Sequence, residues 1–231
     1  MKTKSNMTVK DKENQVICGD CLEVLKTLPN ESVDCIITDP PYGTNTNQRD
    51  TFMVGEFSNI MPLVLPELFR VLKKDGAFYC FTSWSRMSDW LIRYQQYFKL
   101  QNIIVWDKKK HSGCYSSQSW QFTWEGIFFG IKGKRKIYKY MPDVISSNEK
   151  GKRIAMQKPV DIIEKLIEAS TKENDIILDP FIGSGSTLVA CKKLNRKYIG
   201  IEINPDYVEI TRQRINNLPT RLPLWKQNLI W

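Results

Sequence analysis

The fold is decided by the stretch Ile176-Ile177-Leu178-Asp179-Pro180-Phe181-Ile182-Gly183-Ser184-Gly185-Ser186-Thr187, in which a short apolar run leads into a glycine-rich turn. A helical pattern follows from Leu188 to Leu194. A glycine-rich turn between strand and helix lets the backbone approach a ligand closely and directs the amides of the helix N-terminus toward it. The stretch therefore predicts a strand, a turn that binds a nucleotide-like ligand and a helix, in that order.

The spacing of the glycines narrows the choice of ligand. The third glycine of a dinucleotide fingerprint would fall at Leu188, and no Gly-Lys-Ser/Thr follows as a P-loop requires. About twenty residues on, Lys197–Glu202 is a second apolar run that ends in an acid, where a carboxylate can receive the two hydroxyls of a ribose. The alternative for Glu202 is a solvated charge at a strand end. We therefore expect a ribose-containing ligand that is neither NAD nor ATP.

A second motif, Asp39-Pro40-Pro41-Tyr42, ends the apolar run Val33–Thr38. The two prolines fix φ at consecutive positions and remove two amide donors, so the carbonyls of Asp39 and Pro40 are left to accept hydrogen bonds. A carboxylate, a carbonyl and an aromatic ring suit a nucleobase, because the oxygens can take both hydrogens of an exocyclic amine while the ring stacks on the base. The alternative is a plain turn at the end of a strand.

Together the two motifs resemble the amino-group DNA methyltransferases that use S-adenosylmethionine. The catalytic motif precedes the cofactor motif, an order that resembles the β class of this family, whose fold is circularly permuted. The resemblance covers about residues 15 to 215 and includes 18–25, 72–77 and 157–159. It implies a doubly wound α/β fold with a mostly parallel seven-stranded sheet, in which six strands are parallel and one is antiparallel.

The resemblance also implies which residues form the site. The catalytic candidates are Asp39, Pro40, Pro41 and Tyr42. Asp20 and Cys21 are assigned to the adenine end of S-adenosylmethionine and Glu202 to its ribose, although Asp20 can also cap a helix that begins at Cys21. Phe181 can alternatively pack in the core. The cofactor-binding candidates are Asp20, Cys21, Asp39, Lys158, Asp179, Phe181, Gly183, Ser184, Gly185, Ser186, Glu202 and Asn204.

One match to the family is partial. The family usually has His-Pro-Thr before Gln-Lys-Pro, whereas this chain has Ile154-Ala155-Met156 before Gln157-Lys158-Pro159. Contacts of that histidine and threonine cannot be transferred to this chain. Only Lys158 is carried over from the segment.

Composition indicates one domain with a single core. A chain of 231 residues with 42% apolar content is long enough for one such domain. We expect a single methyltransferase domain over 1–231, with a target-recognition region at about 107–153 between a catalytic half (15–106) and a cofactor half (154–215). No apolar run approaches the roughly 20 residues of a membrane span, and the start lacks the apolar centre of a signal peptide, so we expect a cytoplasmic protein without a membrane partner.

The cysteines do not suggest a metal site. Of the six, only Cys18 and Cys21 are close in sequence, and His111 is the only histidine. Cys35, Cys80 and Cys191 lie in apolar patterns and are expected to be buried. We therefore predict no bound metal.

The net charge of +9 is concentrated in the middle segment. Residues 107–153 contain eleven basic and four acidic residues, which accounts for +7 of the total. A solvated basic face is one explanation, but this concentration also predicts a surface that binds DNA phosphates. The candidate DNA-binding residues are Lys108, Lys109, Lys110, Lys132, Lys134, Arg135 and Lys136. Base contacts are expected in the loops 108–119 and 132–153.

Hydrophobic periodicity predicts alternating strands and helices. Trp120, Phe122 and Trp124 alternate with period two and predict one face of a strand that continues to Ile131. Asn204-Pro205 predicts the start of the last helix. Strands are expected at 15–18, 33–38, 76–82, 101–106, 121–131, 175–178 and 197–202, and helices at 61–72, 87–98 and 160–169.

The predicted activity is methylation of the N6 amino group of adenine in a specific duplex DNA sequence, by base flipping and direct in-line transfer. Aspartate at position 39 favours adenine, because cytosine N4 enzymes of this family more often have serine there. The alternatives are a cytosine N4 methyltransferase, more distantly an RNA or protein-amide methyltransferase, and a DNA-binding regulator without activity. The resemblance also allows a homodimer and a companion restriction endonuclease.

Overall fold

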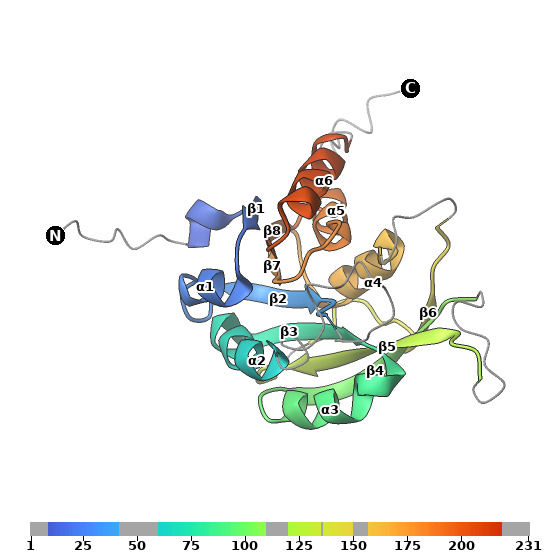
Figure 1. The fold of residues 1–231 in the computed structure, drawn as a ribbon. Helices are drawn as coiled ribbons and strands as arrows, with labels where there is room; N and C mark the ends of the chain where they lie inside the picture. Colours follow the sequence, from blue (N-terminus) through green and yellow to red (C-terminus); the bar gives the residue numbers. More distant parts are fainter. Residues whose placement is uncertain (1–8, 42–59, 110–119, 135, 150–156, 219–231) are drawn as a thin grey trace.

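The strands form one twisted sheet with the order β1-β8-β7-β2-β3-β5-β4-β6 (Figure 1). The computed structural model describes residues 9–41, 60–109, 120–134, 136–149 and 157–218. Only β5 runs antiparallel to its neighbours in this part of the chain. The strands are β1 (Gln15–Cys18), β2 (Val33–Thr38), β3 (Leu72–Thr82), β4 (Lys99–Asp107), β5 (Trp124–Ile131), β6 (Val144–Ser146), β7 (Ile176–Asp179) and β8 (Lys197–Glu202).

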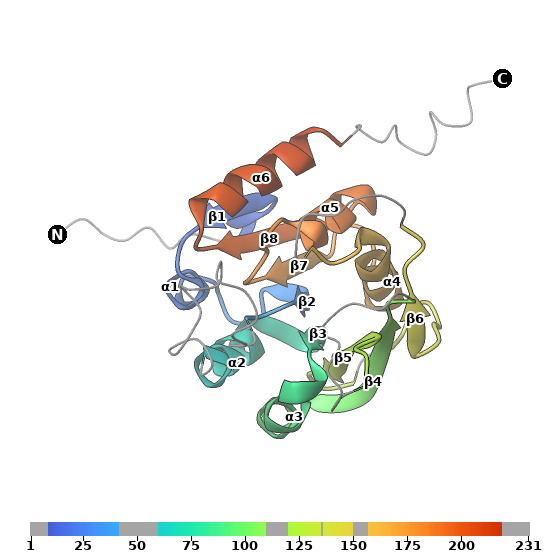
Figure 2. The ribbon, with the colours of Figure 1, turned by 45° about the vertical axis from the view of Figure 1, so that its right-hand side comes forward.

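Helices cover both faces of the sheet, as Figure 2 shows from a second direction. One face packs against α1 (Cys21–Lys26), α2 (Ile60–Val71) and α3 (Met87–Gln95). The other packs against α4 (Val160–Ser170), α5 (Ser186–Lys193) and α6 (Pro205–Asn216). Two short 3-10 helices, η1 (Val9–Lys12) and η4 (Trp84–Arg86), complete the described elements. Because both faces are covered, the central strands are apolar throughout rather than alternating.

The doubly wound, mostly parallel α/β fold predicted from the sequence is confirmed. The strand count was wrong, because the described sheet has eight strands rather than seven. The additional strand is β6, a three-residue edge strand that pairs in parallel with the end of β4. Three residues carry too little alternation to be recognised as a strand in the sequence. The circular permutation stays a prediction.

The predicted strand 121–131 was wrong at its start. β5 begins at Trp124, opposite Asp107 at the end of β4, so the ladder has no further β4 residue to pair with earlier positions. Trp120 is 94% exposed, and the Phe122 ring stacks on Trp84 at 5.6 Å instead of lying on a strand face. Because of the period-two pattern of aromatics, the predicted strand started before the point at which β5 has a β4 residue to pair with.

Three cysteines lie in the core formed by the sheet and its helices. Cys35, Cys80 and Cys191 are buried, as predicted. Over the described ranges, no helix combines the length and the apolar character needed to cross a bilayer. Likewise, no cluster of three or more His, Cys, Asp or Glu side chains suited to a metal occurs in the described part of the chain.

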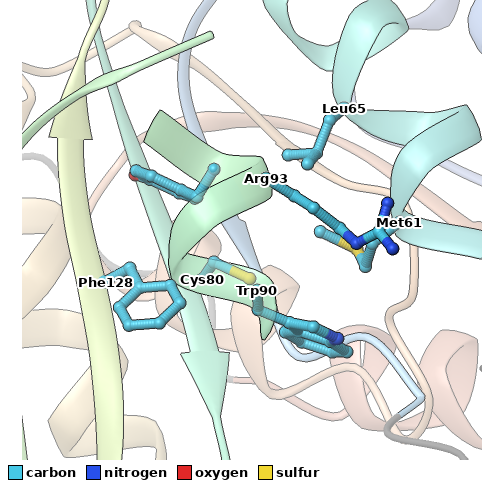
Figure 3. Close-up of a pocket in the computed structure, with 7 residues that line it drawn as sticks. Met61, Leu65, Cys80, Trp90, Arg93 and Phe128 are labelled. Atoms are coloured by element: carbon cyan, nitrogen blue, oxygen red, sulfur yellow. The ribbon is translucent and has the colours of Figure 1, made fainter. Parts of the chain in front are cut away.

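A pocket lies between α2 and α3 on the face of the sheet opposite α4 (Figure 3). Met61 and Leu65 of α2, Trp90 and Arg93 of α3, and Cys80 and Phe128 of the sheet point toward it. Its lining is apolar except for Arg93, and it contains none of the described site residues predicted from the sequence. This pocket is therefore a gap in helix packing and not the site of the predicted chemistry.

Candidate active site

The site lies where the direction of chain winding changes in the sheet. From β7 the chain continues through α5 to the neighbouring β8, whereas from β2 it continues through α2 to β3 on the other side. β2 and β7 are themselves neighbours, with Ile36 paired to Leu178. Ligands of open α/β sheets bind at the carboxyl ends of the strands at such a switch point. Asp39 follows β2 and Asp179 ends β7, so both predicted acids lie at this point.

The Asp39 carboxylate belongs to a network of four alternating charges. Its Oδ2 contacts the ammonium of Lys158, which lies 3.3 Å from Oε2 of Glu125. The other Glu125 oxygen, Oε1, lies 2.5 Å from the ammonium of Lys108. We call Asp39, Lys158, Glu125 and Lys108 the charge network. It joins the end of β2, the second residue before α4 and the paired ends of β4 and β5.

Burial and charge oppose each other within the charge network. Lys158 has a side chain only 9% exposed, and burial alone would lower its pKa. The carboxylates of Asp39 and Glu125 outweigh burial, so the pKa of Lys158 lies above its ordinary value. For Glu125, burial favours the neutral acid, but Lys158 and Lys108 outweigh it and lower the pKa of this carboxyl group. Lys158 and Glu125 are therefore both charged near neutral pH.

Asp179 has different surroundings. It is 3% exposed and accepts hydrogen bonds from Thr38 Oγ1 (2.9 Å) and the Phe181 amide (3.1 Å). Burial raises the pKa of Asp179 to about 7, although the hydrogen bonds from Thr187, Phe181 and Thr38 act in the opposite direction. The charge of Asp39 contributes a smaller upward shift. Asp179 is thus a carboxyl group that changes its charge near neutral pH.

The glycine turn after Asp179 has the shape predicted for it. Gly183 and Gly185 have φ of 49° and 83°, in the left-handed region that glycine adopts without steric cost. A Cβ on Gly185 would lie 2.5 Å from Thr211 Cγ2, so α6 closes against the turn there. A Cβ on Gly183 would meet nothing within 4 Å, so open space lies beside this residue. The Thr211 hydroxyl donates to the Gly183 carbonyl (3.0 Å) and fixes the turn.

The start of α5 is tied to the charge network through Lys158. Ser186, its first residue, donates from its hydroxyl to the carbonyl of Lys158 (2.8 Å). Ser184 accepts from Arg214 of α6 through its carbonyl and its Oγ. Phe181 is half-buried and packs against the apolar cluster of the α1–α3 face.

Glu202 and Asp20 lie next to each other at the carboxyl ends of β8 and β1. The Cys18–Glu202 pair ends this ladder, and the Gly19 amide donates to the Glu202 carbonyl (2.9 Å). The Glu202 carboxylate accepts from the Gly183 amide (2.9 Å), which places it against the glycine turn. Asp20 accepts from the amides of Leu22 and Glu23 and caps α1, the structural role considered for it from the sequence.

The remaining cofactor candidates occupy helix starts. Cys21 is the buried first residue of α1, and burial raises the pKa of its thiol to about 12. Asn204 caps α6 by accepting from the Asp206 amide (2.9 Å). Both lie at the sheet edge that carries Glu202.

The predicted donor set fits an adenosyl cofactor. The glycine turn has open space beside Gly183, donates from the Gly183 amide to Glu202 and from the Phe181 amide to Asp179, and carries the half-buried Phe181 ring. A carboxylate that accepts from the turn can also accept ribose hydroxyls, since each of its oxygens has two lone pairs. Asp20, Glu202, Asp179 and Asp39 follow one another along the sheet order β1-β8-β7-β2.

Lys132, Lys134 and Lys136 follow β5 and lie at the opposite ends of the parallel strands from Asp39 and Asp179, and the DNA-binding role predicted for them stays a prediction. β5 is antiparallel, with Gly126 paired to Thr82 and Ile131 to Ala77, so it carries the chain away from the catalytic edge. Residues after Ile131 therefore lie about 17 Å away, at the amino ends of the parallel strands. Lys132 donates to the carbonyls of Phe69 (2.9 Å) and Leu72 (2.8 Å) and is structural. The strand was predicted, but its direction was not. Lys134 and Lys136 are exposed at the amino ends of the parallel strands.

Lys108 and Lys109 lie at the catalytic edge, directly after β4. The Lys109 amide donates to the Asp107 side chain (2.8 Å), which forms a tight turn. Tyr42, Lys110 and Arg135 fall outside the described residues, so their predicted roles stay predictions. Pro40 is buried and Pro41 half-buried beside Asp39.

Two functional candidates were missed in the sequence. Glu125 was counted only as one acidic residue in a basic segment. It is the second residue of β5, and its carboxylate lies 3.3 Å from the Lys158 ammonium. Thr38, the last residue of β2, was read as part of an apolar run but bonds to Asp179. Pairing of distant residues determines both contacts, and a single sequence does not reveal it.

Comparison with known proteins agrees with this geometry. The family described as DNA methylase matches residues 33–213. The Type II methyltransferase M2.LlaDCHI of Lactococcus lactis subsp. cremoris is 32% identical, over 89% of this chain and 91% of its own. The DNA adenine methyltransferase YhdJ of Escherichia coli (strain K12) is 29% identical, over 87% of this chain and 82% of its own.

Solved structures match over similar lengths. The M1.HpyAVI–SAM complex has a TM-score of 0.68 and 28% identity, covering 87% of this chain and 99% of that one. The cytosine-N4-specific PvuII DNA methyltransferase has a TM-score of 0.71 at 20% identity, covering 94% of this chain and 90% of its own, and shares the fold. Since the family match extends over most of the chain, this protein belongs to the DNA methylase family of N6 and N4 amino-group methyltransferases.

Proposed function

We propose that this protein transfers a methyl group from S-adenosylmethionine to the N6 amino group of adenine in a specific duplex DNA sequence. The observation that carries the proposal is the meeting of Asp39 and the glycine turn after Asp179 at the switch point of the sheet. A relative named as a DNA adenine methyltransferase and a similar structure described as a SAM complex support it.

The chemistry requires an acceptor for the hydrogens of an aryl amine. The nitrogen lone pair of adenine is delocalised into the ring, so the amine is a poor nucleophile until its hydrogens are held by strong acceptors. The Asp39 carboxylate and the Pro40 carbonyl accept them as positive charge develops on nitrogen. Bound S-adenosylmethionine supplies an electrophilic methyl group on its sulfonium. The proton leaves afterwards through Asp39 or water.

The cofactor residues have distinct tasks in this proposal. Glu202 accepts the ribose hydroxyls, and Asp20 with Cys21 lies at the adenine end. Asp179 faces the cationic methionine part beside the open space at Gly183, and Phe181 with Ser184 lines that part of the pocket. Lys158 has a different place, because its ammonium contacts Asp39 and Glu125.

The DNA approaches the catalytic edge of the sheet. Lys108 and Lys109 follow β4 at this edge, and the stacked Trp84 and Phe122 rings lie beside it at the ends of β3 and the start of β5. Trp84 is 56% exposed, as is expected of an aromatic surface that contacts unstacked bases. Tyr42 holds the flipped base. Target recognition therefore centres on the part of 107–153 before Trp124.

Cytosine N4 is the alternative target. The PvuII enzyme has the same fold, so the fold does not select the base. Asp39 favours adenine through the family resemblance. The reading as an inactive DNA-binding regulator is disfavoured because Asp39, Asp179 and Glu202 occupy adjacent strand ends.

The deciding experiment is methylation of DNA followed by digestion to nucleosides. Duplex DNA made by PCR carries no methylated bases, and it is incubated with the protein and labelled S-adenosylmethionine. The label is expected in N6-methyldeoxyadenosine. Label in N4-methyldeoxycytidine would mean that the target is cytosine and not adenine. A parallel reaction contains RNA in place of DNA, and label in that reaction alone would overturn DNA as the substrate. No label in either reaction would favour the inactive regulator.

The homodimer and the companion restriction endonuclease stay predictions from the family resemblance. Light scattering of the purified protein, with and without DNA, tests the first. The companion endonuclease is tested by the survival of cells that express a candidate restriction endonuclease, with and without this protein.

A further inference from the structure

The charge network contains a buried lysine that the proposed reaction does not use. Lys158 is 9% exposed, so its ammonium does not reach DNA phosphates from the surface. A buried cation is costly unless it is paired, and the described partners of this one are the carboxylates of Asp39 and Glu125. The Phe81 ring, 5.4 Å from the Lys158 ammonium, closes one side of it. The lysine therefore acts on Asp39.

Asp39 requires such a cation. Besides Lys158, the negative charge of Asp39 acts on Asp179 of β7 and Cys80 of β3 and raises the pKa of both groups. Two carboxylates that share one site raise each other's affinity for a proton. A protonated Asp39 would donate a hydrogen bond instead of accepting one, and the adenine amine would lose its acceptor. An opposite charge at Oδ2 keeps this carboxylate ionised.

Glu125 limits the effect of that cation. Its Oε2 lies 3.3 Å from the Lys158 ammonium, so the lysine divides its charge between two carboxylates. Without Glu125, the full charge would fall on Asp39 and weaken it as an acceptor of amine hydrogens. Glu125 is held in turn by Lys108, which lies 2.5 Å from Oε1.

The same lysine also links the acceptor to the cofactor turn. Its carbonyl accepts the Ser186 hydroxyl (2.8 Å) at the start of α5, while its ammonium contacts Asp39. One residue thus contacts both the Asp39 carboxylate and the helix start that follows the glycine turn. A change in its position moves the acceptor relative to the glycine turn.

We propose that Lys158 and Glu125 are positioning residues that keep the Asp39 carboxylate ionised, oriented and strong enough to accept the amine hydrogens. This inference rests on the proposed function and adds two residues to its mechanism. Lys158 provides the positive charge, and Glu125 sets how much of that charge Asp39 receives.

The test compares the pH dependence of methyl transfer in Lys158→Met and Glu125→Gln. Single-turnover rates on PCR-made duplex DNA are measured at saturating cofactor between pH 5 and 9. Lys158→Met is expected to move the midpoint of the acid limb upward by about 1–3 pH units, because an opposite charge is lost from Asp39. Glu125→Gln is expected to move it downward, because Lys158 then acts on Asp39 alone.

An ion pair between α4 and α5 provides the matched control. Lys193 and Glu164 lie 2.9 Å apart with side chains 46% and 25% exposed, and the same substitutions, Lys193→Met and Glu164→Gln, should leave the midpoint unchanged. Cofactor affinity is measured over the same pH range for every variant. Titration of Asp179 is expected to change the affinity for the cofactor, whereas titration of Asp39 is expected to change the rate at saturating cofactor. The two measurements therefore separate the two groups.

Each outcome supports or overturns the inference. Opposite shifts in the two variants support it. A lower rate without a shift, or shifts in the same direction, would overturn it and leave the pair a structural role. If Lys158→Met does not fold, Glu125→Gln alone tests the inference. The midpoint of its acid limb must then move downward, and an unchanged or raised midpoint would overturn the inference. Failure of the wild-type protein to methylate DNA would instead contradict the proposed function.

Discussion

The loop after β2 and the turn after β7 contain carboxylates on neighbouring strands, yet these carboxylates have opposite surroundings. Asp39 meets the ammonium of Lys158, whereas Asp179 is hydrogen-bonded by Thr38, Thr187 and the Phe181 amide, all uncharged donors. Consequently Asp39 lies against an opposite charge, whereas burial raises the pKa of Asp179 to about 7. The comparison shows that the segments packed next to a strand end, and not the residue type, determine whether its carboxyl group meets a charged or an uncharged partner.

The largest effect is expected from the acceptor itself. Asp39→Ala should reduce the single-turnover rate by about a thousandfold or more, since a preorganised group that stabilises developing charge is removed. Cofactor affinity, measured by calorimetry, should stay at the wild-type value. Asp39→Asn, which retains one carbonyl acceptor, should fall between the two. Loss of cofactor binding in Asp39→Ala would mean that the two carboxylates do not have separate tasks.

The next effect concerns the rigidity of the turn after β7. Gly185→Ala should lower the free energy of unfolding by about 3 kcal/mol, because it combines a left-handed backbone with a clash against Thr211. Gly183→Ala has open space and should cost only about 1 kcal/mol. Urea unfolding measures both. Adding Thr211→Ser to Gly185→Ala should recover part of the loss, and equal losses in the two alanine variants would contradict the packing of α6 on this turn.

A smaller effect is expected in the pH dependence of cofactor binding. Below its pKa of about 7, Asp179 is neutral, and above it the carboxylate attracts a cationic ligand. Affinity for S-adenosylmethionine should therefore rise about tenfold from pH 6 to pH 8, as the ionised fraction does. Asp179→Asn should remove this dependence. The product S-adenosylhomocysteine, which lacks the sulfonium charge, should show a weaker one, and a flat profile for both ligands would place Asp179 away from the cofactor.

The smallest effect distinguishes the two edges of the sheet. Lys109→Ala should reduce the slope of log affinity for DNA against log salt by about 0.9, the value for one phosphate contact. The double variant Lys134→Ala, Lys136→Ala should leave the slope unchanged, since these lysines lie at the far edge. Fluorescence anisotropy at several salt concentrations measures both. A reduced slope only in the double variant would return the DNA surface to the basic run.

Local pattern was enough to predict most of the fold. The apolar runs before Asp39, Asp179 and Glu202 became parallel strands because both faces of this sheet are covered, and the sequence displays that burial directly. The glycine turn was recognisable because left-handed backbone restricts the residues allowed at 183 and 185.

The features that could not be predicted from the sequence depend on pairing between residues that are distant in the chain. The direction of β5 depends on which strands it joins, so the sequence did not show that the basic run after Ile131 lies at the opposite ends of the strands from Asp39. Glu125 became visible only when β5 brought it beside Lys158, which is 33 positions away in the chain. The three-residue β6 forms because β4 offers an unpaired edge, not because its own sequence demands a strand.

The pairing of Asp107 with Trp124 closes the stem of a hairpin whose two strands belong to the core of the sheet. The intervening chain can therefore change in length and composition while both of its anchors stay fixed. Doubling the length of such a connection adds only about 0.6 kcal/mol of closure entropy. We therefore expect this chain to tolerate changes in length and composition between Asp107 and Trp124 without displacement of Asp39 or the glycine turn.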